Sequence, residues 1–368
     1  MERNLVINFV AFHGGGVLYS YEMTKAMCMD GRCNIYAIVS SKMENIENWR
    51  LIPRLHLIEI KGYSNRLNFV LNLLYFYAVE FIRIKRLFTG INIAAVYIPF
   101  VSFWTNHIQR LFKKTRTFYT MHDVYPHNNK KNLVWKISDK LAMKCDHIII
   151  LSDYFRNDIK INYHKLDSNI LTVPHGNYYN GVNKKGATST YDDTLYNFIY
   201  FGQIQEYKGL DVLADAFRLL FKERKDVSLT IAGSGDFSPY RDKFAAAKCP
   251  NLRIINRWIT DEEIPELFSA KKQITVLPYK SASQSGVIPL SMHLQSLVIA
   301  TNCSGISEQV INGKTGFLVE PNNVESLLSV MLFVISNWGE MEKIVEQAYQ
   351  HIESMDWGAI SCAVIDHI

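Results

Sequence analysis

Short apolar runs rich in β-branched residues alternate along this chain with longer stretches of helical periodicity. In the first half we expect strands at residues 5–12, 35–40, 55–60, 94–98, 117–121, 147–151 and 170–173. Helical stretches lie between most of these runs. Because strands that are apolar along their whole length are typical of a sheet covered on both faces, the pattern predicts a parallel α/β sheet.

A polar stretch at residues 176–194 interrupts this pattern and is typical of an interdomain linker. A second alternating series follows it, with strands expected at residues 198–201, 228–232, 252–255, 274–277, 298–300 and 316–319. We therefore predict two α/β domains, at residues 1–180 and 195–354, with a C-terminal helix at 355–368 that packs back on the first. Ligands of such sheets bind beyond the carboxyl ends of the strands, so two facing domains would form a cleft.

Residues 67–87 are apolar enough to be mistaken for a membrane span. Several polar side chains interrupt the segment, and charges at membrane depth are costly. The interrupting residues are Asn68, Asn72, Glu80, Arg83 and Lys85. We interpret the segment as a buried helix that covers a sheet. The alternative is a partly exposed helix with a basic end at 82–86 that lies on a bilayer.

The composition is that of an ordinary globular protein. The chain has 368 residues, 48% of them hydrophobic and 20% charged, which excludes a disordered chain, a collagen-like fibre and a coiled coil. The six cysteines show no CxxC pairing, so we expect neither a disulfide framework nor a zinc site, and a reducing compartment fits better. The first residues are predicted to form a strand rather than a signal peptide.

The net charge is +5, and the visible basic clusters all lie in the first half of the chain. They are found at residues 83–86, 113–116, 130–131 and 184–185. Such clusters are compatible with solvated helix faces. The alternative is attraction to an anionic membrane or to a phosphate-bearing acceptor. No nucleic-acid-binding motif accompanies them, so we expect no nucleic-acid partner.

A glycine-rich turn, His13-Gly14-Gly15-Gly16, follows the first expected strand and precedes a helical run. Glycine lets the backbone approach a ligand closely, and a helix N-terminus attracts anions. The GxGxxG pattern and later acidic residue of a dinucleotide site are both missing. A tight turn without a ligand remains the alternative.

Three further segments carry candidate chemistry at strand ends in the second half. Lys208 lies in a loop before a helix, where an ammonium group can meet a diphosphate. In the small-residue loop after residue 277, Ser283 or Ser285 can cap a helix that starts near Gly286. The N–H groups of Gly286 and Val287 would then form an anion site. Residues 301–319 contain Glu308 shortly after a strand end, followed by a turn.

Taken in order, these segments resemble the glycosyltransferase group 1 family, also called family 4. Residues 202–211 are similar to the family's G-x-x-x-x-K-G-x-D entry to the second domain. Residues 231–235 are similar to its I-x-G-x-G strand end, and residues 298–316 match its last motif. In the first domain the resemblance rests on the glycine turn and on Thr120-Met121-His122-Asp123.

The resemblance implies a GT-B fold of two Rossmann-like domains facing a cleft. It implies a cytoplasmic enzyme that moves a sugar from a nucleotide-diphosphate sugar to a glycan or lipid-linked acceptor with retention of configuration. Surface polysaccharide or glycoconjugate biosynthesis is the expected setting. Peripheral contact with the inner face of an anionic membrane stays open.

The resemblance also assigns roles to single residues. Lys208 would neutralise the diphosphate, Glu308 would hold a donor hydroxyl or orient its loop, and His122 would lie opposite the sugar. The remaining expected donor-binding positions are Gly15, Gly16, Gly202, Gln203, Gly233, Trp258, Ile259, Ser283, Ser285, Gly286, Val287 and Ser291. No metal cofactor is expected, because Lys208 and a helix N-terminus can offset the charge of the leaving diphosphate.

The chain departs from the family pattern at the donor site. Gln203 and Gln205 occupy the region where many members carry an arginine, and Ser283 and Ser291 stand where many carry two glutamates. A subset of the family has S-Q-S-G-V instead, and this chain follows that variant. A catalytically silent nucleotide-sugar-binding subunit, and an epimerase or phosphorylase on the same fold, therefore remain alternatives.

Overall fold

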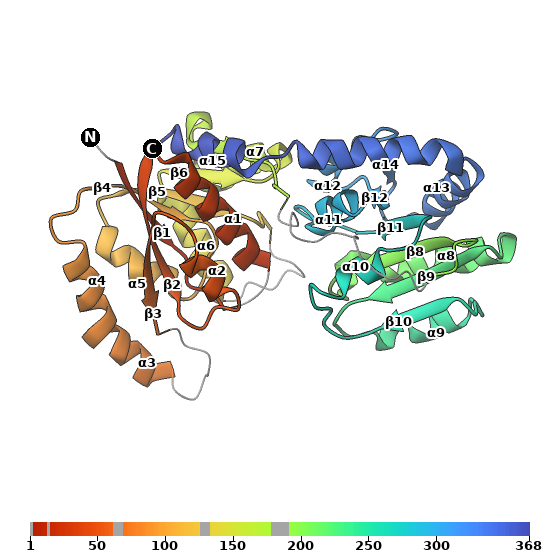
Figure 1. The fold of residues 1–368 in the computed structure, drawn as a ribbon, viewed down its shortest axis with the longest axis horizontal. Helices are drawn as coiled ribbons and strands as arrows, with labels where there is room; N and C mark the ends of the chain where they lie inside the picture. Colours follow the sequence, from red (N-terminus) through yellow and green to blue (C-terminus); the bar gives the residue numbers. More distant parts are fainter. Residues whose placement is uncertain (1–2, 13–14, 62–68, 126–132, 178–190) are drawn as a thin grey trace. The chain divides into compact units, whose positions relative to one another are not determined.

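The computed structural model describes residues 3–12, 15–61, 69–125, 133–177 and 191–368, which form two compact α/β units (Figure 1). The first unit consists of Met1–Pro174 and Asp356–Ile368, and the second of His175–Met355. Most of the expected linker, residues 178–190, lies outside the described residues, as do His13, Gly14 and the basic pairs at 130–131 and 184–185.

The first unit is built on a seven-stranded parallel sheet in the order β3-β2-β1-β4-β5-β6-β7. Its strands are β1 (Arg3–Asn8), β2 (Cys33–Ser40), β3 (Leu55–Ile60), β4 (Ile93–Ile98), β5 (Arg116–Met121), β6 (His147–Ile150) and β7 (Ile170–Thr172). All seven lie where the apolar runs predicted them, although β1 ends at Asn8. Its central strands are fully buried, as expected for a sheet covered on both faces.

The helices of this unit connect its parallel strands. They are α1 (Gly15–Asp30), α2 (Ile46–Arg50), α3 (Phe69–Tyr75), the π-helical turn η2 (Phe76–Glu80), α4 (Phe81–Leu87), α5 (Thr105–Gln109), the 3-10 turn η3 (Arg110–Phe112), α6 (Leu133–Lys144), α7 (Arg156–Tyr163) and α15 (Trp357–Ile365). Short 3-10 turns also lie at Asp153–Phe155 and Asp167–Asn169.

The second unit is built on a six-stranded parallel sheet in the order β10-β9-β8-β11-β12-β13. Its strands are β8 (Tyr196–Phe201), β9 (Val227–Ala232), β10 (Leu252–Ile255), β11 (Gln273–Leu277), β12 (Leu297–Thr301) and β13 (Phe317–Val319). Alternate residues of β8 pack into two separate apolar clusters, Phe198 and Tyr200 in one and Ile199 and Phe201 in the other. Both faces of the sheet are therefore covered, as the sequence predicted.

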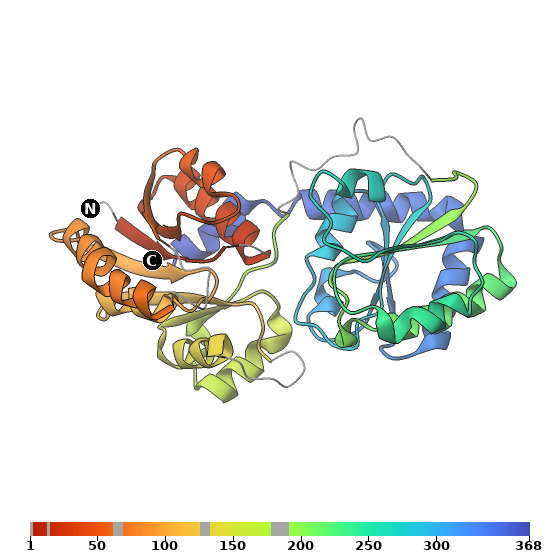
Figure 2. The same cartoon turned by 90° about the horizontal axis from the view of Figure 1, so that it is seen from below.

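Helices and short turns connect these strands and end the unit (Figure 2). They are η7 (Glu206–Lys208), α8 (Leu210–Glu223), η8 (Ser238–Tyr240), α9 (Arg241–Ala245), α10 (Ile264–Leu267), α11 (Val287–His293), α12 (Ile306–Gln309), α13 (Val324–Ser336) and α14 (Trp338–Glu353). The α13 helix has a side-chain cap, because the Asn323 side chain accepts a hydrogen bond from the Ser326 N–H.

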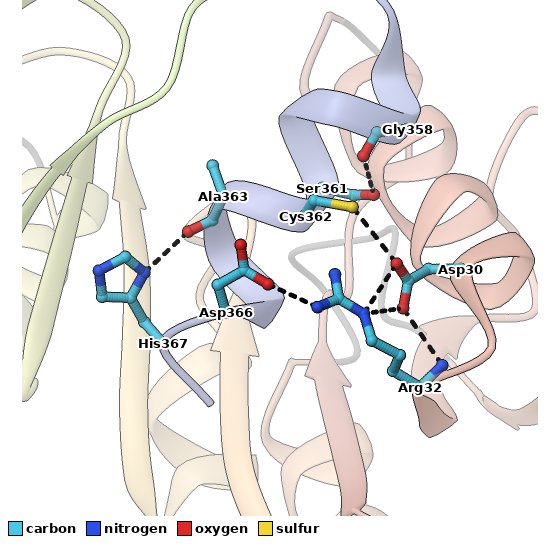
Figure 3. A network of polar contacts seen from close by, with 8 residues as sticks. All are labelled: Asp30, Arg32, Gly358, Ser361, Cys362, Ala363, Asp366 and His367. Atoms are coloured by element: carbon cyan, nitrogen blue, oxygen red, sulfur yellow. Dashed lines mark hydrogen bonds and ion pairs between the residues drawn. The ribbon is translucent and has the colours of Figure 1, made fainter.

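The C-terminal helix α15 packs against α1 of the first unit. Trp357 is buried there, with its ring 5.5 Å from that of Tyr19. At the other end of α15, Arg32 joins Asp366 to Asp30, and the Cys362 thiol donates to the Asp30 carboxylate (Figure 3). These exposed ion pairs add little stability on their own, so the apolar side of α15 provides the main attachment.

Residues 69–87 correct one sequence-based interpretation. We expected a buried helix, but among residues 71–87, whose burial the structure describes, only Phe76, Glu80 and Ile84 are buried. The side chains of Leu71 and Leu74 are 68% and 63% exposed. One side of the helix is thus buried against the core, and apolar side chains on its other side are exposed. Within the described residues, the structure has no helix with the length and apolarity needed to cross a membrane.

Candidate functional site

The carboxyl edge of the second sheet brings together loops that follow β8, β9, β11 and β12. The β8 loop is tied to the β9 loop by backbone hydrogen bonds from the Gly202 N–H to the Ala232 carbonyl (3.0 Å) and from the Ile204 N–H to the Ser234 carbonyl (2.8 Å). The Lys280 N–H donates to the Tyr207 carbonyl (2.7 Å) and ties the β8 loop to the β11 loop. The predicted motifs of this half of the chain therefore form one continuous edge, the usual ligand edge of a parallel α/β sheet.

Two glycines make this close packing of loops possible. A Cβ atom at Gly233 would lie 1.9 Å from the Gly202 carbonyl oxygen, and one at Gly209 would lie 1.9 Å from the Pro278 carbonyl oxygen. Both residues also have a positive φ, at 155° and 68°, which side chains disfavour. The glycine spacing that the sequence shows is thus a packing requirement of the site.

We expect Gly233→Ala to lower the free energy of unfolding by about 1–3 kcal/mol or more, because the new methyl group forces the β8 and β9 loops apart. Thermal unfolding measures this loss. Gly339→Ala in α14 is the matched control, since nothing lies within 4 Å of its added Cβ. Equal unfolding temperatures for Gly233→Ala and the wild type would contradict the packing argument.

Lys208 lies at the centre of this edge. Its ammonium group donates to the Tyr279 hydroxyl at 3.2 Å and lies 4.7 Å from the centre of that ring. Burial works against its charge, but the phenol groups of Tyr279 and Tyr207 outweigh this, so the pKa of Lys208 lies above its usual value. A Cβ atom at Gly202 would lie 3.5 Å from the Lys208 ammonium. Position 202 therefore lies beside a fixed positive charge, and glycine places no side chain there.

The β11 loop presents the start of α11 to the same space. A Cβ at Gly202 would also lie 3.7 Å from a Val287 methyl group. The N-cap residue of α11 is Gly286, so neither expected serine is the cap, but the hydroxyl of the preceding Ser285 accepts the Val287 N–H at 3.2 Å. The Val287 N–H is therefore already satisfied. Among the described residues the Gly286 N–H meets no acceptor, so it is the amide that a ligand can use.

Gln309 fixes the conformation of the β11 loop. Its side-chain oxygen accepts the Ser285 N–H at 2.7 Å, and its side-chain nitrogen donates to the Ser285 carbonyl at 3.1 Å. Thr301 adds a hydrogen bond from its hydroxyl to the Tyr279 carbonyl at 2.6 Å. Sequence reasoning missed Gln309 and Tyr279. The only signal in the sequence was their position: Gln309 directly follows the motif residue Glu308, and Tyr279 lies shortly after the end of β11.

Other expected donor-site residues lie at or near this edge with different exposure. Gln203 is exposed and its side-chain oxygen accepts a hydrogen bond from Gln205 at 2.8 Å. Ser283 is half-buried, and Glu308 is exposed on α12. Trp258, which follows β10, is 62% exposed.

Two expected donor contacts lie inside the second unit. The Ile259 side chain packs into an apolar cluster. Only the backbone of Ile259 is therefore left to contact a donor. Ser291 is fully buried within α11, and its hydroxyl has no partner among the described residues. The expectation of a donor contact from the Ser291 side chain is therefore wrong for this conformation, because α11 turns this position into the core.

A second cluster of expected residues lies at the carboxyl edge of the first sheet. Gly16 is in the first turn of α1, and a Cβ there would lie 2.7 Å from the ring of Phe100. The Phe100 ring lies 4.8 Å from that of His122, and Tyr19 approaches His122 edge-on at 4.7 Å. The glycine turn and His122, apart in sequence, therefore meet through Phe100, which sequence reasoning did not single out. Gly15 begins α1.

His122 is held in a defined orientation. Its Nε2 atom donates to the Pro99 carbonyl oxygen at 2.9 Å. Burial lowers the pKa of His122, against the opposing effects of this hydrogen bond and of the Asp123 charge. The ring is therefore neutral at pH 7 and can exchange a proton without first losing a charge.

Comparisons with known proteins bear on both units. Residues 185–351 match the sequence profile of a family described as glycosyl transferases group 1. An uncharacterized glycosyltransferase of Methanocaldococcus jannaschii is 28% identical over 214 residues, which cover 58% of this chain and 56% of the relative. The capsular polysaccharide biosynthesis glycosyltransferase CapM of Staphylococcus aureus is 25% identical over 238 residues, 61% of each protein. The chain thus matches little more than half the length of these curated relatives.

Solved structures resemble the whole chain. Anabaena HepE in complex with UDP and glucose has a TM-score of 0.73 at 14% identity, covering 100% of this chain and 99% of that one. A glycosyltransferase from Rickettsia africae has a TM-score of 0.71 at 19% identity, covering 100% and 97%. At such identities the likeness establishes the fold, and it confirms the expected architecture of two Rossmann-like domains, GT-B.

Proposed function

We propose, from the group 1 glycosyltransferase domain that this chain carries at residues 185–351, that the protein transfers a sugar from a nucleotide-diphosphate sugar to a glycan or lipid-linked acceptor. The observation that carries the proposal is the meeting, at Gly202, of the Lys208 ammonium and of Val287 at the start of α11. A fixed cation beside a glycine is suited to a diphosphate. The fold is shared with HepE, whose structures contain UDP and UDP-glucose.

The chemistry requires stabilisation of a leaving group. An acceptor hydroxyl forms a bond to the anomeric carbon, the bond from that carbon to the diphosphate oxygen breaks, and the hydroxyl proton passes to the departing diphosphate oxygen. Negative charge grows on the departing nucleoside diphosphate. Lys208 and the Gly286 N–H are placed to bind that charge, and preorganised charges of this kind lower the barrier to transfer.

The finer parts of the proposal follow from the resemblance. Retention of configuration is proposed from the resemblance to group 1 enzymes. In their mechanism, the acceptor attacks the anomeric carbon from the same face from which the leaving group departs. Surface polysaccharide biosynthesis is proposed as the setting because CapM, a relative, is named for capsular polysaccharide biosynthesis. Glu308, exposed on α12, is proposed to bind a donor hydroxyl.

A panel of UDP-, GDP- and ADP-sugars, incubated with and without a lipid-linked acceptor, tests the function. We expect release of nucleoside diphosphate that depends on the acceptor, with a product that keeps the donor's anomeric configuration by NMR. A catalytically silent subunit would bind the nucleotide sugar but would not release nucleoside diphosphate from it. An epimerase would interconvert donors without an acceptor, and either outcome would overturn the proposal.

We propose that transfer proceeds without a divalent metal. The site already has a fixed positive charge at Lys208 and a free amide at Gly286, which can offset the leaving diphosphate. Turnover is therefore expected to survive exhaustive chelation with EDTA. Activity that vanishes on chelation and returns with magnesium or manganese would show that an ion is required.

A further inference from the structure

The helical segment Phe69–Leu87 of the first unit has two unlike sides. It is formed by α3, η2 and α4, which follow one another without a break. One side packs on the core through Phe76 and Ile84, which belong to the same apolar cluster as the central strands. With the buried Glu80 between them, the buried positions recur at intervals of four residues, as expected for the inner stripe of a helix.

The opposite side, which we call the outer apolar face, consists of Leu71, Leu74, Val79 and Ile82. Their side chains are 68%, 63%, 43% and 43% exposed. Isolated exposed apolar residues are common in soluble proteins, but four along one helix form a continuous patch. Such a patch indicates a binding surface.

The exposed charges of the described segment Phe69–Leu87 are all positive. Glu80, the one acidic residue of the described segment Phe69–Leu87, is buried, and it accepts a hydrogen bond from Arg83 at 2.8 Å. Lys85 and Arg86 are exposed in the last turn of α4. The only acidic group of the helix is thus neutralised inside the protein, while its cations remain at the surface.

Neighbouring elements place further cations against two tyrosines of the helix. The Lys61 ammonium lies 5.4 Å from the ring of Tyr75, and Arg110 of η3 donates to the Tyr77 hydroxyl at 2.7 Å. Lys113 and Lys114, exposed, follow η3. A helix with an exposed apolar face and exposed cations in its last turn is suited to the interface between lipid headgroups and acyl chains.

We propose that the helical segment Phe69–Leu87 binds the surface of an anionic membrane. The outer apolar face enters the boundary between headgroups and acyl chains, and Lys85 and Arg86 meet the anionic lipid headgroups. Charge complementarity selects this partner, because a second copy of the chain would bring the same positive border against itself. At about 1.5 Å per residue, the helix is roughly 28 Å long and lies in the plane of the membrane.

Sedimentation with phosphatidylcholine vesicles, with and without phosphatidylglycerol, tests the apolar part of this surface. The variant Leu71→Gln/Leu74→Gln/Ile82→Gln should lower the partition coefficient on anionic vesicles by at least about tenfold. Ile161→Gln/Leu166→Gln is the matched control, because these residues are 71% and 70% exposed elsewhere in the same unit. The control should bind as the wild type does, and unchanged thermal unfolding shows that both variants fold.

The charged part is tested with Lys85→Gln/Arg86→Gln. This variant should weaken binding to anionic vesicles by about tenfold, and the wild type should lose binding as salt is raised. Lys248→Gln/Lys343→Gln removes the same charge from exposed positions of the second unit and should have little effect. Absence of wild-type binding at low salt, or equal losses in variant and control, would overturn the proposal. A wild-type dimer that the Leu71→Gln/Leu74→Gln/Ile82→Gln variant abolishes in analytical ultracentrifugation would assign the face to a second copy instead.

Discussion

Replacing Lys208 by alanine is expected to weaken the binding of UDP by about tenfold to a hundredfold. The ammonium is half-buried, held against the Tyr279 ring, and next to Gly202. Its raised pKa keeps it charged throughout the neutral range. A charge-assisted contact with a phosphate oxygen would be lost with the side chain. Isothermal titration calorimetry measures the change.

Lys272 provides the matched control for this experiment. Its ammonium lies 4.5 Å from the ring of Tyr196, so it has the same kind of cation–π contact as Lys208. It precedes β11, at the amino edge of the sheet, whereas Lys208 lies at the carboxyl edge. Lys272→Ala should leave UDP affinity unchanged, and Lys208→Arg should retain much of it. Equal affinities for Lys208→Ala and the wild type would remove Lys208 from the donor site.

The sheets could be predicted because their sequence signal is local. Each strand is a short apolar run bounded by polar or glycine residues, as at Ile35–Ser40 or Ile274–Leu277, and burial on both faces leaves little room for polar residues. Where a strand ends is less local. Residues 9–12 continue the apolar run of β1, yet the ladder stops at Asn8 because pairing depends on the neighbouring strands.

The helix at Phe69–Leu87 shows where the local signal fails. Its composition is apolar on nearly all sides, and composition alone does not tell which side the core will cover. In the structure the core takes Phe76 and Ile84, and leaves Leu71 and Leu74 at the surface. The alternative kept open from sequence, a partly exposed helix, describes it better than a buried helix.

The candidate site was predictable where a motif defines backbone geometry. Gly209 and Gly233 have positive φ and no room for a Cβ, so the family spacing is recovered in the structure. Residues whose roles depend on distant neighbours were not predictable. Gln309 acts on a loop 24 residues earlier, and Phe100 joins Gly16 to His122 from another strand. Ser291 was misplaced because sequence does not show which side of a short helix faces the core.

His122→Ala is expected to lower turnover by about a hundredfold or more while leaving UDP affinity unchanged. The expectation rests on the proposed function and on the family resemblance, which implies that His122 lies opposite the sugar. The ring is neutral at pH 7 and is oriented by its hydrogen bond to the Pro99 carbonyl and by the Phe100 and Tyr19 rings. Steady-state kinetics and calorimetry separate the two effects. Equal losses of turnover and affinity would indicate a folding role.

The pH profile distinguishes chemistry at His122 from a structural contribution. Because burial lowers its pKa below the ordinary value of about 6.5, the stability that the neutral ring contributes is complete above that pH and is lost as the pH falls through the lowered pKa. Turnover should fall over the same acid range. The pH profile of His122→Gln should not show this fall in turnover at acid pH.

His147 is the matched control for these measurements, since it is a buried histidine of the same unit whose pKa burial also lowers. It begins β6, at the amino edge of the first sheet, and its ring stacks on Phe118 at 4.5 Å. His147→Ala should therefore destabilise the fold and retain the turnover of each folded molecule. If His122→Ala and His147→Ala lower turnover alike, the effect comes from losing a buried ring, and His122 has no separate part in transfer.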